Sequence, residues 1–70
     1  MTNTKMLNDL IDKLGLKRSY VAEKAGFSRA TLYKKINNQV PFNQYEIERL
    51  CEILKIKDLK TKESIFFNKM

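Results

Sequence analysis

Apolar residues recur at helical spacing along most of this 70-residue chain, and no segment shows the alternation typical of a strand. The first pattern predicts a helix over about 4–14, ended by Gly15, whose inner face is Leu7, Leu10, Ile11 and Leu14. A later pattern predicts a helix that begins at Asn43, forms a capping-box pair with Glu46, and has the inner face Ile47, Leu50, Cys51 and Leu54.

Between these two segments, the chain from Arg18 to Asn37 predicts a pair of short helices joined by a glycine turn. They span about 18–25 and 29–37, with inner faces formed by Val21, Ala22, Ala25, Leu32 and Ile36. The small Ala22 leaves room for a close helix crossing, Gly26 tolerates the left-handed backbone of the turn, and Ser28 offers an N-cap oxygen. This spacing is that of a helix-turn-helix unit.

The rest of the chain adds connectors and a C-terminal element. Leu16 is expected to pack inward, residues 40–42 to form an extended, proline-restricted link, and Ile56 to close the hydrophobic run. A short fifth helix is expected over about 58–64, followed by the apolar cluster Ile65, Phe66 and Phe67. The chain is therefore predicted to be all-α, a compact bundle of four or five helices in one domain (1–70), with its core in about 4–56 and a short helix or tail in 57–70.

The formal net charge is +6, and much of the excess falls on the helix-turn-helix segment. Residues 17–35 hold six basic residues against Glu23 alone, a net charge of +5, whereas residues 43–54 are net acidic. The tail 55–70 has a net charge of +3. A surface that contacts phosphates requires such a local excess.

Size and residue types argue against an enzyme. A chain this short buries a small core, which leaves little room for a catalytic cleft. The chain has no His, and its single cysteine, Cys51, lies on an apolar stripe, so we expect no catalytic triad, metal site, cofactor or small-molecule substrate. Without a signal-peptide pattern or a long apolar run, the sequence predicts a reduced, cytoplasmic protein that does not bind membranes.

The outward positions of the second short helix carry the chemistry for reading DNA. An α-helix fits the major groove, where side chains from its first turns reach base edges. Arg29 can donate two hydrogen bonds to a guanine, and Ala30 can offer its methyl to a thymine. Tyr33 and Lys34 follow one turn later on the same face. Tyr33 is suited to stack on a sugar or to bond a phosphate or base edge, and Lys34 to reach a base or the backbone.

Flanking residues are suited to hold the DNA backbone. Arg18 begins the first short helix, where its side chain and backbone amide can both contact a phosphate, and Lys17 extends that contact. The end of the second short helix and the turn after it supply Lys35, Asn37, Asn38 and Gln39 for the opposite phosphates.

Each of these features also has a plain structural interpretation. A basic helix face is commonly just solvated, Tyr33 can shield the edge of the core, Ser28 can act only as an N-cap, and Asn37 only as a C-cap. The helix-turn-helix frame favours nucleic-acid contact, because it presents the basic face in a way that an arbitrary basic helix does not.

The segment VAEKAGFSRATLYKKINN (21–38) resembles the helix-turn-helix of the lambda-repressor/Cro family (Xre type), in which the pattern LAEKLGVSRSTIS…NG recurs. The resemblance covers about residues 5–56, and SRATLYKKIN and the tail ESIFFN are similar to segments of small phage-encoded Cro-like regulators. It implies a five-helix DNA-binding domain, often dimeric on a palindromic operator. By position it also implies that Arg18 replaces a frequent Gln, that Asn37 contacts the backbone, and that the base-reading face is Ser28, Arg29, Ala30, Tyr33 and Lys34.

Three residues depart from the family pattern. Lys17 stands where Thr or Ser often caps the following helix, so this helix start is expected to be less well defined. Lys35 occupies a commonly apolar position, and Ile36 is expected to take over the buried role. Asn38 replaces the usual Gly and tolerates the left-handed conformation nearly as well.

The resulting prediction is a Cro-type repressor of a phage or prophage genetic switch, which binds operator double-stranded DNA through the helix at about 29–37. The cluster Ile65–Phe67 is either a homodimer contact or folds back onto the helix at 4–14 or 43–54. The alternative function is a helix-turn-helix module that binds a partner repressor protein as an antirepressor or modulator. RNA binding and catalysis are less favoured.

Overall fold

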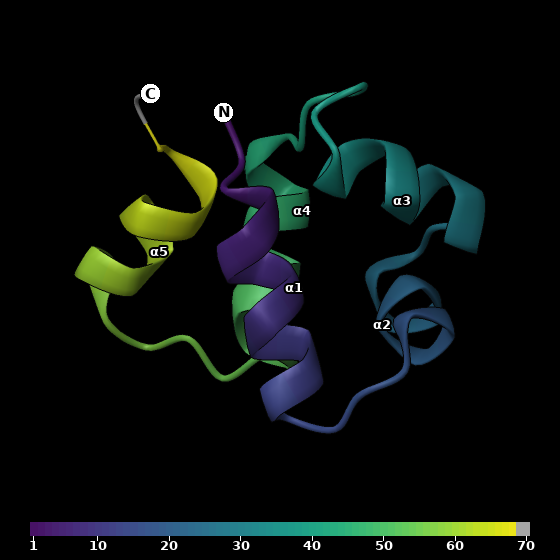
Figure 1. Cartoon of the computed structure of the whole chain (residues 1–70), viewed down its shortest axis with the longest axis horizontal. Helices are drawn as coiled ribbons and strands as arrows, with labels where there is room; N and C mark the ends of the chain where they lie inside the picture. The colour runs from purple at the N-terminus through teal and green to yellow at the C-terminus, as the bar shows by residue number, and fades with distance from the viewer. Residues whose placement is uncertain (69–70) are drawn as a thin grey trace.

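A computed structural model describes residues 1–68, which form five α-helices and no strand. The helices are α1 (Thr4–Lys13), α2 (Arg18–Ala25), α3 (Arg29–Ile36), α4 (Gln44–Ile53) and α5 (Leu59–Phe66). In Figure 1, α1 crosses in front of α4 at the centre, with α5 on one side and α2 and α3 on the other. The prediction of an all-α helix-turn-helix bundle is confirmed.

Helix starts follow the capping side chains in the sequence. Helices α1, α3, α4 and α5 each begin after a residue whose side chain accepts a hydrogen bond from an amide three residues later: Asn3, Ser28, Asn43 and Asp58. The capping box of α4 is complete, since the Asn43 amide also donates to Glu46 Oε1 at 2.9 Å. As expected for Lys17, α2 begins without a side-chain cap.

Helices α1 to α4 end in the same way, with a left-handed residue that turns two backbone amides back onto the last helical carbonyls. After α2, Gly26 has φ 86° and its amide donates to the Glu23 carbonyl at 3.2 Å, while the Phe27 amide donates to the Ala22 carbonyl at 2.8 Å. The corresponding residues at the other three ends are Gly15, Asn38 and Lys55. The expectation that Asn38 tolerates this conformation is confirmed.

The core forms where the predicted inner faces meet. Its buried members from α1 to the end of α4 are Leu7, Ile11, Val21, Ala22, Leu32, Ile36, Ile47, Leu50, Cys51 and Leu54. One predicted core residue is wrong: Leu14, the C-cap residue of α1, is 41% exposed. Burial raises the pKa of the Cys51 thiol, which keeps it protonated at neutral pH and fits a core role.

The C-terminal apolar cluster is divided between core and surface. Ile65 and Phe66 are 1% and 4% exposed, in an α5 that packs against α1 and runs two residues past its expected end at Ser64. The Phe66 ring meets Phe42 edge-on, with centroids 5.7 Å apart. Of the predicted dimer contact, only Phe67 remains on the surface, at 51% exposure.

Ala22 governs the close approach of α2 to its neighbours. It is 1% exposed, and α2 contacts both α3 and α4. We expect Ala22→Leu to lower stability by about 1–3 kcal/mol, because the crossing has no space for a larger side chain. Thermal denaturation measures this effect, and Ala25→Leu, at a half-buried position of the same helix, is the matched control with a smaller cost. A melting temperature for Ala22→Leu at or above that of the wild type would contradict the close crossing.

Candidate nucleic-acid interface

Helix α3 lies at the edge of the bundle (Figure 1). One of its faces is buried and the other is exposed. Leu32 and Ile36 hold the inner face in the core. The outer face presents Arg29, Ala30, Tyr33 and Lys34, all exposed, with Tyr33 at 64%. Among residues 1–68, no hydrogen bond or ion pair engages the side chains of Arg29, Tyr33 or Lys34. These three side chains therefore lie on the outer, solvent-exposed face of α3.

Ser28 fixes the start of this helix. Its hydroxyl accepts a hydrogen bond from the Thr31 amide at 3.1 Å and donates one to Thr31 Oγ1 at 3.0 Å. The expected N-cap role is therefore confirmed. The Ser28 hydroxyl is therefore engaged with Thr31 in this structure.

A groove beside α3 joins the two groups of predicted DNA contacts. It has a volume of about 270 Å³ and is lined by Asn8, Arg18, Arg29, Leu32, Tyr33, Ile36 and Asn37. Arg18, a predicted backbone contact, therefore shares one hollow with Arg29 and Tyr33, two predicted base readers. Asn8 was not predicted, because it is a single polar residue on α1 without any motif around it.

The two asparagines after α3 both form hydrogen bonds within the protein. Asn37 Nδ2 donates to the Tyr33 carbonyl at 2.9 Å, which is the C-cap interpretation. The amide of Asn38 clamps the backbone of Thr2, accepting from its N–H and donating to its carbonyl, both at 2.8 Å. Asn38 therefore secures the N-terminal segment to the end of α3. Lys17 and Gln39, also predicted as backbone contacts, are exposed.

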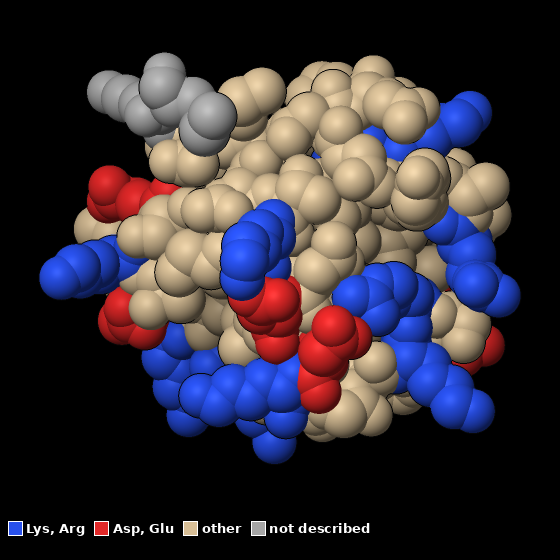
Figure 2. Space-filling model, viewed as in Figure 1, with Lys and Arg blue, Asp and Glu red and all other residues tan. Residues whose placement is uncertain are grey.

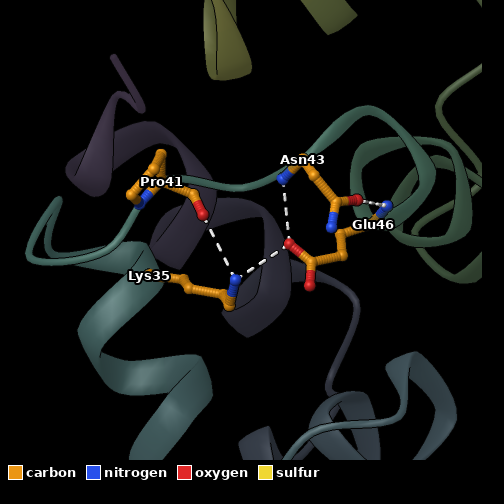
Figure 3. A network of polar contacts seen from close by, with 4 residues as sticks. All are labelled: Lys35, Pro41, Asn43 and Glu46. Carbon is orange, nitrogen blue, oxygen red and sulfur yellow. Dashed lines mark hydrogen bonds and ion pairs between the residues drawn. The ribbon is translucent and has the colours of Figure 1, made fainter.

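The structure corrects the role assigned to Lys35. This residue is only 9% exposed, and its ammonium donates to Glu46 Oε1 at 2.9 Å and to the Pro41 carbonyl at 3.2 Å (Figure 3). The same ammonium lies 5.2 Å from the ring centroid of Phe27. Because the Lys35 side chain is buried and its ammonium is engaged by these partners, Lys35 is not placed to contact a phosphate. Ile36 is 2% exposed and takes the buried role expected of it, and Lys35 is buried as well.

Charge is distributed unevenly over the surface. Figure 2 shows Lys and Arg side chains along the side of the molecule formed by α2 and α3, with little acidic surface between them. Towards α1, α4 and α5, acidic and basic side chains alternate, as in the Lys62–Glu48 pair at 2.6 Å. The basic side includes the outer face of α3, and is therefore suited to a polyanion.

Other kinds of site receive no support from the described part of the chain. Among residues 1–68, no group of three His, Cys, Asp or Glu side chains is placed to hold a metal ion. None of the described helices is long and apolar enough to cross a membrane.

An exposed basic helix, presented by a glycine turn from a second helix, defines a helix-turn-helix DNA-binding domain. The model of the Cro/C1-type HTH DNA-binding domain matches residues 6–59, which include both helices and the groove beside them. The chain belongs to this family, as the resemblance of residues 21–38 predicted. Comparison with curated proteins and with solved structures gave no match.

Proposed function

We propose that this DNA-binding protein is a Cro-type transcriptional repressor of a phage or prophage genetic switch, and that it reads an operator with α3. The observation that carries the proposal is the outer face of α3, where Arg29, Tyr33 and Lys34 are exposed and unpaired within residues 1–68 while Leu32 and Ile36 lock the inner face. Arg29 and Ala30 read bases, and Tyr33 and Lys34 contact bases or the adjoining backbone.

The proposed backbone contacts come from both ends of this face. Lys17 and Arg18 lie at the start of α2, and Gln39 lies beyond α3. Asn37 and Asn38 contribute through the side-chain hydrogen-bonding groups that are not used within the protein. Lys35 makes no such contact, since its ammonium is engaged inside the bundle.

A homodimer is part of the proposal. Two copies would place their α3 helices about 34 Å apart, one turn of DNA. The half-exposed Phe67 is the candidate contact, because it lines a groove with Phe42 and Ile47, beside the Lys62–Glu48 ion pair.

Protection of DNA beside the protein's own gene tests the proposed function. We expect a salt-dependent footprint, and a two-fold symmetric footprint if the protein binds as a dimer. The competing function, modulation of a partner repressor, predicts tight binding to that protein and no protected DNA.

Lys34→Ala is expected to weaken binding to all DNA sequences and to reduce the slope of log affinity against log salt by about one, if this lysine neutralises one phosphate. Fluorescence anisotropy with a mixed-sequence duplex measures the slope between about 50 and 200 mM salt. Lys60→Ala, an exposed lysine on α5, is the control and should leave the slope nearly unchanged. Equal slopes for the wild type and Lys34→Ala would remove Lys34 from the interface.

A further inference from the structure

The guanidinium of Arg18 is held in a defined position by a side chain from another helix. Nε and one terminal nitrogen of Arg18 both donate to Asn8 Oδ1, at 3.2 and 2.8 Å. The other terminal nitrogen donates to Asp12 Oδ1 at 3.0 Å. Asn8 and Asp12 both lie on α1, whereas Arg18 is the first residue of α2. One helix thus orients a side chain that the next helix presents to the groove beside α3.

We propose that Asn8 is a positioning residue for DNA binding, which holds Arg18 ready to receive a phosphate at the edge of the groove beside α3. This inference rests on the proposed function. A guanidinium has five N–H donors, and these contacts use three of them. Two donors therefore stay without a partner within residues 1–68, as a contact with phosphate oxygens requires.

An amide suits this position better than a carboxylate. Asn8 accepts two hydrogen bonds without adding charge, so it orients Arg18 and leaves its positive charge available to DNA. The carboxylate of Asp12 does carry a negative charge, but its side chain is 65% exposed, so water and salt screen the pair.

The location of the groove ties this arrangement to DNA binding. Asn8 and Arg18 line it together with Arg29 and Tyr33, which lie on the exposed face of α3. When α3 enters the major groove, the DNA strand that borders the groove passes close to α3, and Arg18 at the start of α2 faces the hollow beside this helix. Backbone contacts of this kind set the register of a recognition helix on the duplex.

Removing the amide should therefore cost affinity through disorder of Arg18. Immobilising one long side chain on binding lowers affinity by about two- to tenfold. Asn8 avoids this loss, because it already orders the Arg18 side chain in the free protein. We expect Asn8→Ala to weaken binding to a mixed-sequence duplex by about two- to tenfold while the salt slope stays unchanged, because the charges are the same. Alanine favours a helix, so α1 should still form.

A double-mutant cycle tests the proposal. Arg18→Ala should weaken binding and lower the salt slope by about one. In that background, Asn8→Ala should have no further effect on affinity. An equal loss with and without Arg18, or no loss in either background, would overturn the positioning role. Asp58→Ala, which removes the N-cap of α5, controls for lowered stability alone, since α5 lies across α1 from α2 and α3 (Figure 1).

A second measurement, made without DNA, separates the inference from the proposed function. Heteronuclear NMR relaxation of the Arg18 Nε–H should show an ordered side chain in the wild type and a mobile one in Asn8→Ala. Equal mobility in the two proteins would refute the inference even if the wild type binds DNA. An ordered Arg18 in a protein that fails to bind any duplex would refute the proposed function, and with it the use of Arg18 for phosphate.

Discussion

Replacing Lys35 by alanine is expected to lower the free energy of unfolding by about 3 kcal/mol, a much larger loss than any exposed residue of α3 should give. The change leaves the Glu46 carboxylate without its cation in a site where the two side chains are only 10% and 17% exposed. It also frees the Pro41 carbonyl and empties the space beside the ring of Phe27. We place the loss at the lower end of the range for buried pairs, because the Asn43 amide still donates to Glu46.

Urea denaturation measures this loss, and the neighbouring residue supplies the matched control. Lys34→Ala removes the same charge one position earlier, from the exposed face of α3, and should change stability by less than about 0.5 kcal/mol. The two substitutions should therefore have opposite effects in the stability assay and the DNA-binding assay. Lys35→Ala lowers stability without a specific change in the salt slope of DNA binding, and Lys34→Ala does the opposite. A stable Lys35→Ala protein with a reduced salt slope would return Lys35 to the DNA interface.

A double substitution tests whether the Lys35–Glu46 pair stabilises the fold, or whether Lys35→Ala is costly only because it leaves Glu46 charged and unpaired. Lys35→Met with Glu46→Gln removes both charges, roughly conserves volume, and keeps a side-chain oxygen that can accept from the Asn43 amide. We expect this variant to lose less stability than Lys35→Ala, because both charges are removed together and neither is left buried without its partner. A loss as large as that of Lys35→Ala would show that the pair itself is needed for the fold.

Arg29→Ala is expected to weaken binding to the operator by about 1–3 kcal/mol and to relax the preference at one base pair. The reason is positional: Arg29 is the first residue of α3, it is exposed, and the core contacts of Leu32 fix the helix that carries it. A guanidinium at this place can donate two parallel hydrogen bonds to guanine, which neither a shorter nor an apolar side chain can replace.

Binding to the footprinted operator and to its single-base variants measures this effect. Arg29→Lys is the informative companion, because it keeps the charge and loses the planar fork. It should retain most of the affinity for mixed-sequence DNA and lose discrimination at the same base pair as Arg29→Ala. Arg49→Ala, an exposed arginine on α4, should leave the sequence preference intact. An unchanged preference in Arg29→Ala would assign the base contacts to another residue.

The helices and the turn between α2 and α3 could be predicted from the sequence, because local interactions determine them. Apolar spacing identified the inner faces, the side chains of Ser28 and Asn43 marked helix starts, and Gly26 marked the turn. The prediction for Leu14 failed at a helix end, where the apolar spacing continues one residue past Lys13, the last residue of α1. The same local information placed Arg29, Tyr33 and Lys34 on the outer face of α3, where the structure shows them exposed.

Contacts between distant parts of the chain decided the remaining roles. Lys35 reaches Glu46 eleven residues away, Asn38 reaches Thr2 thirty-six away, and Ile65 and Phe66 join the core through α1 and Phe42. Helical spacing states which residues share a face, but not which element covers that face. A lysine with an apolar stem, or an asparagine with two hydrogen-bonding groups, fits solvent, DNA or a protein neighbour equally well. Only the packing of α1, α4 and α5 around the helix-turn-helix determined whether each of these side chains contacts the protein or stays exposed to solvent and DNA.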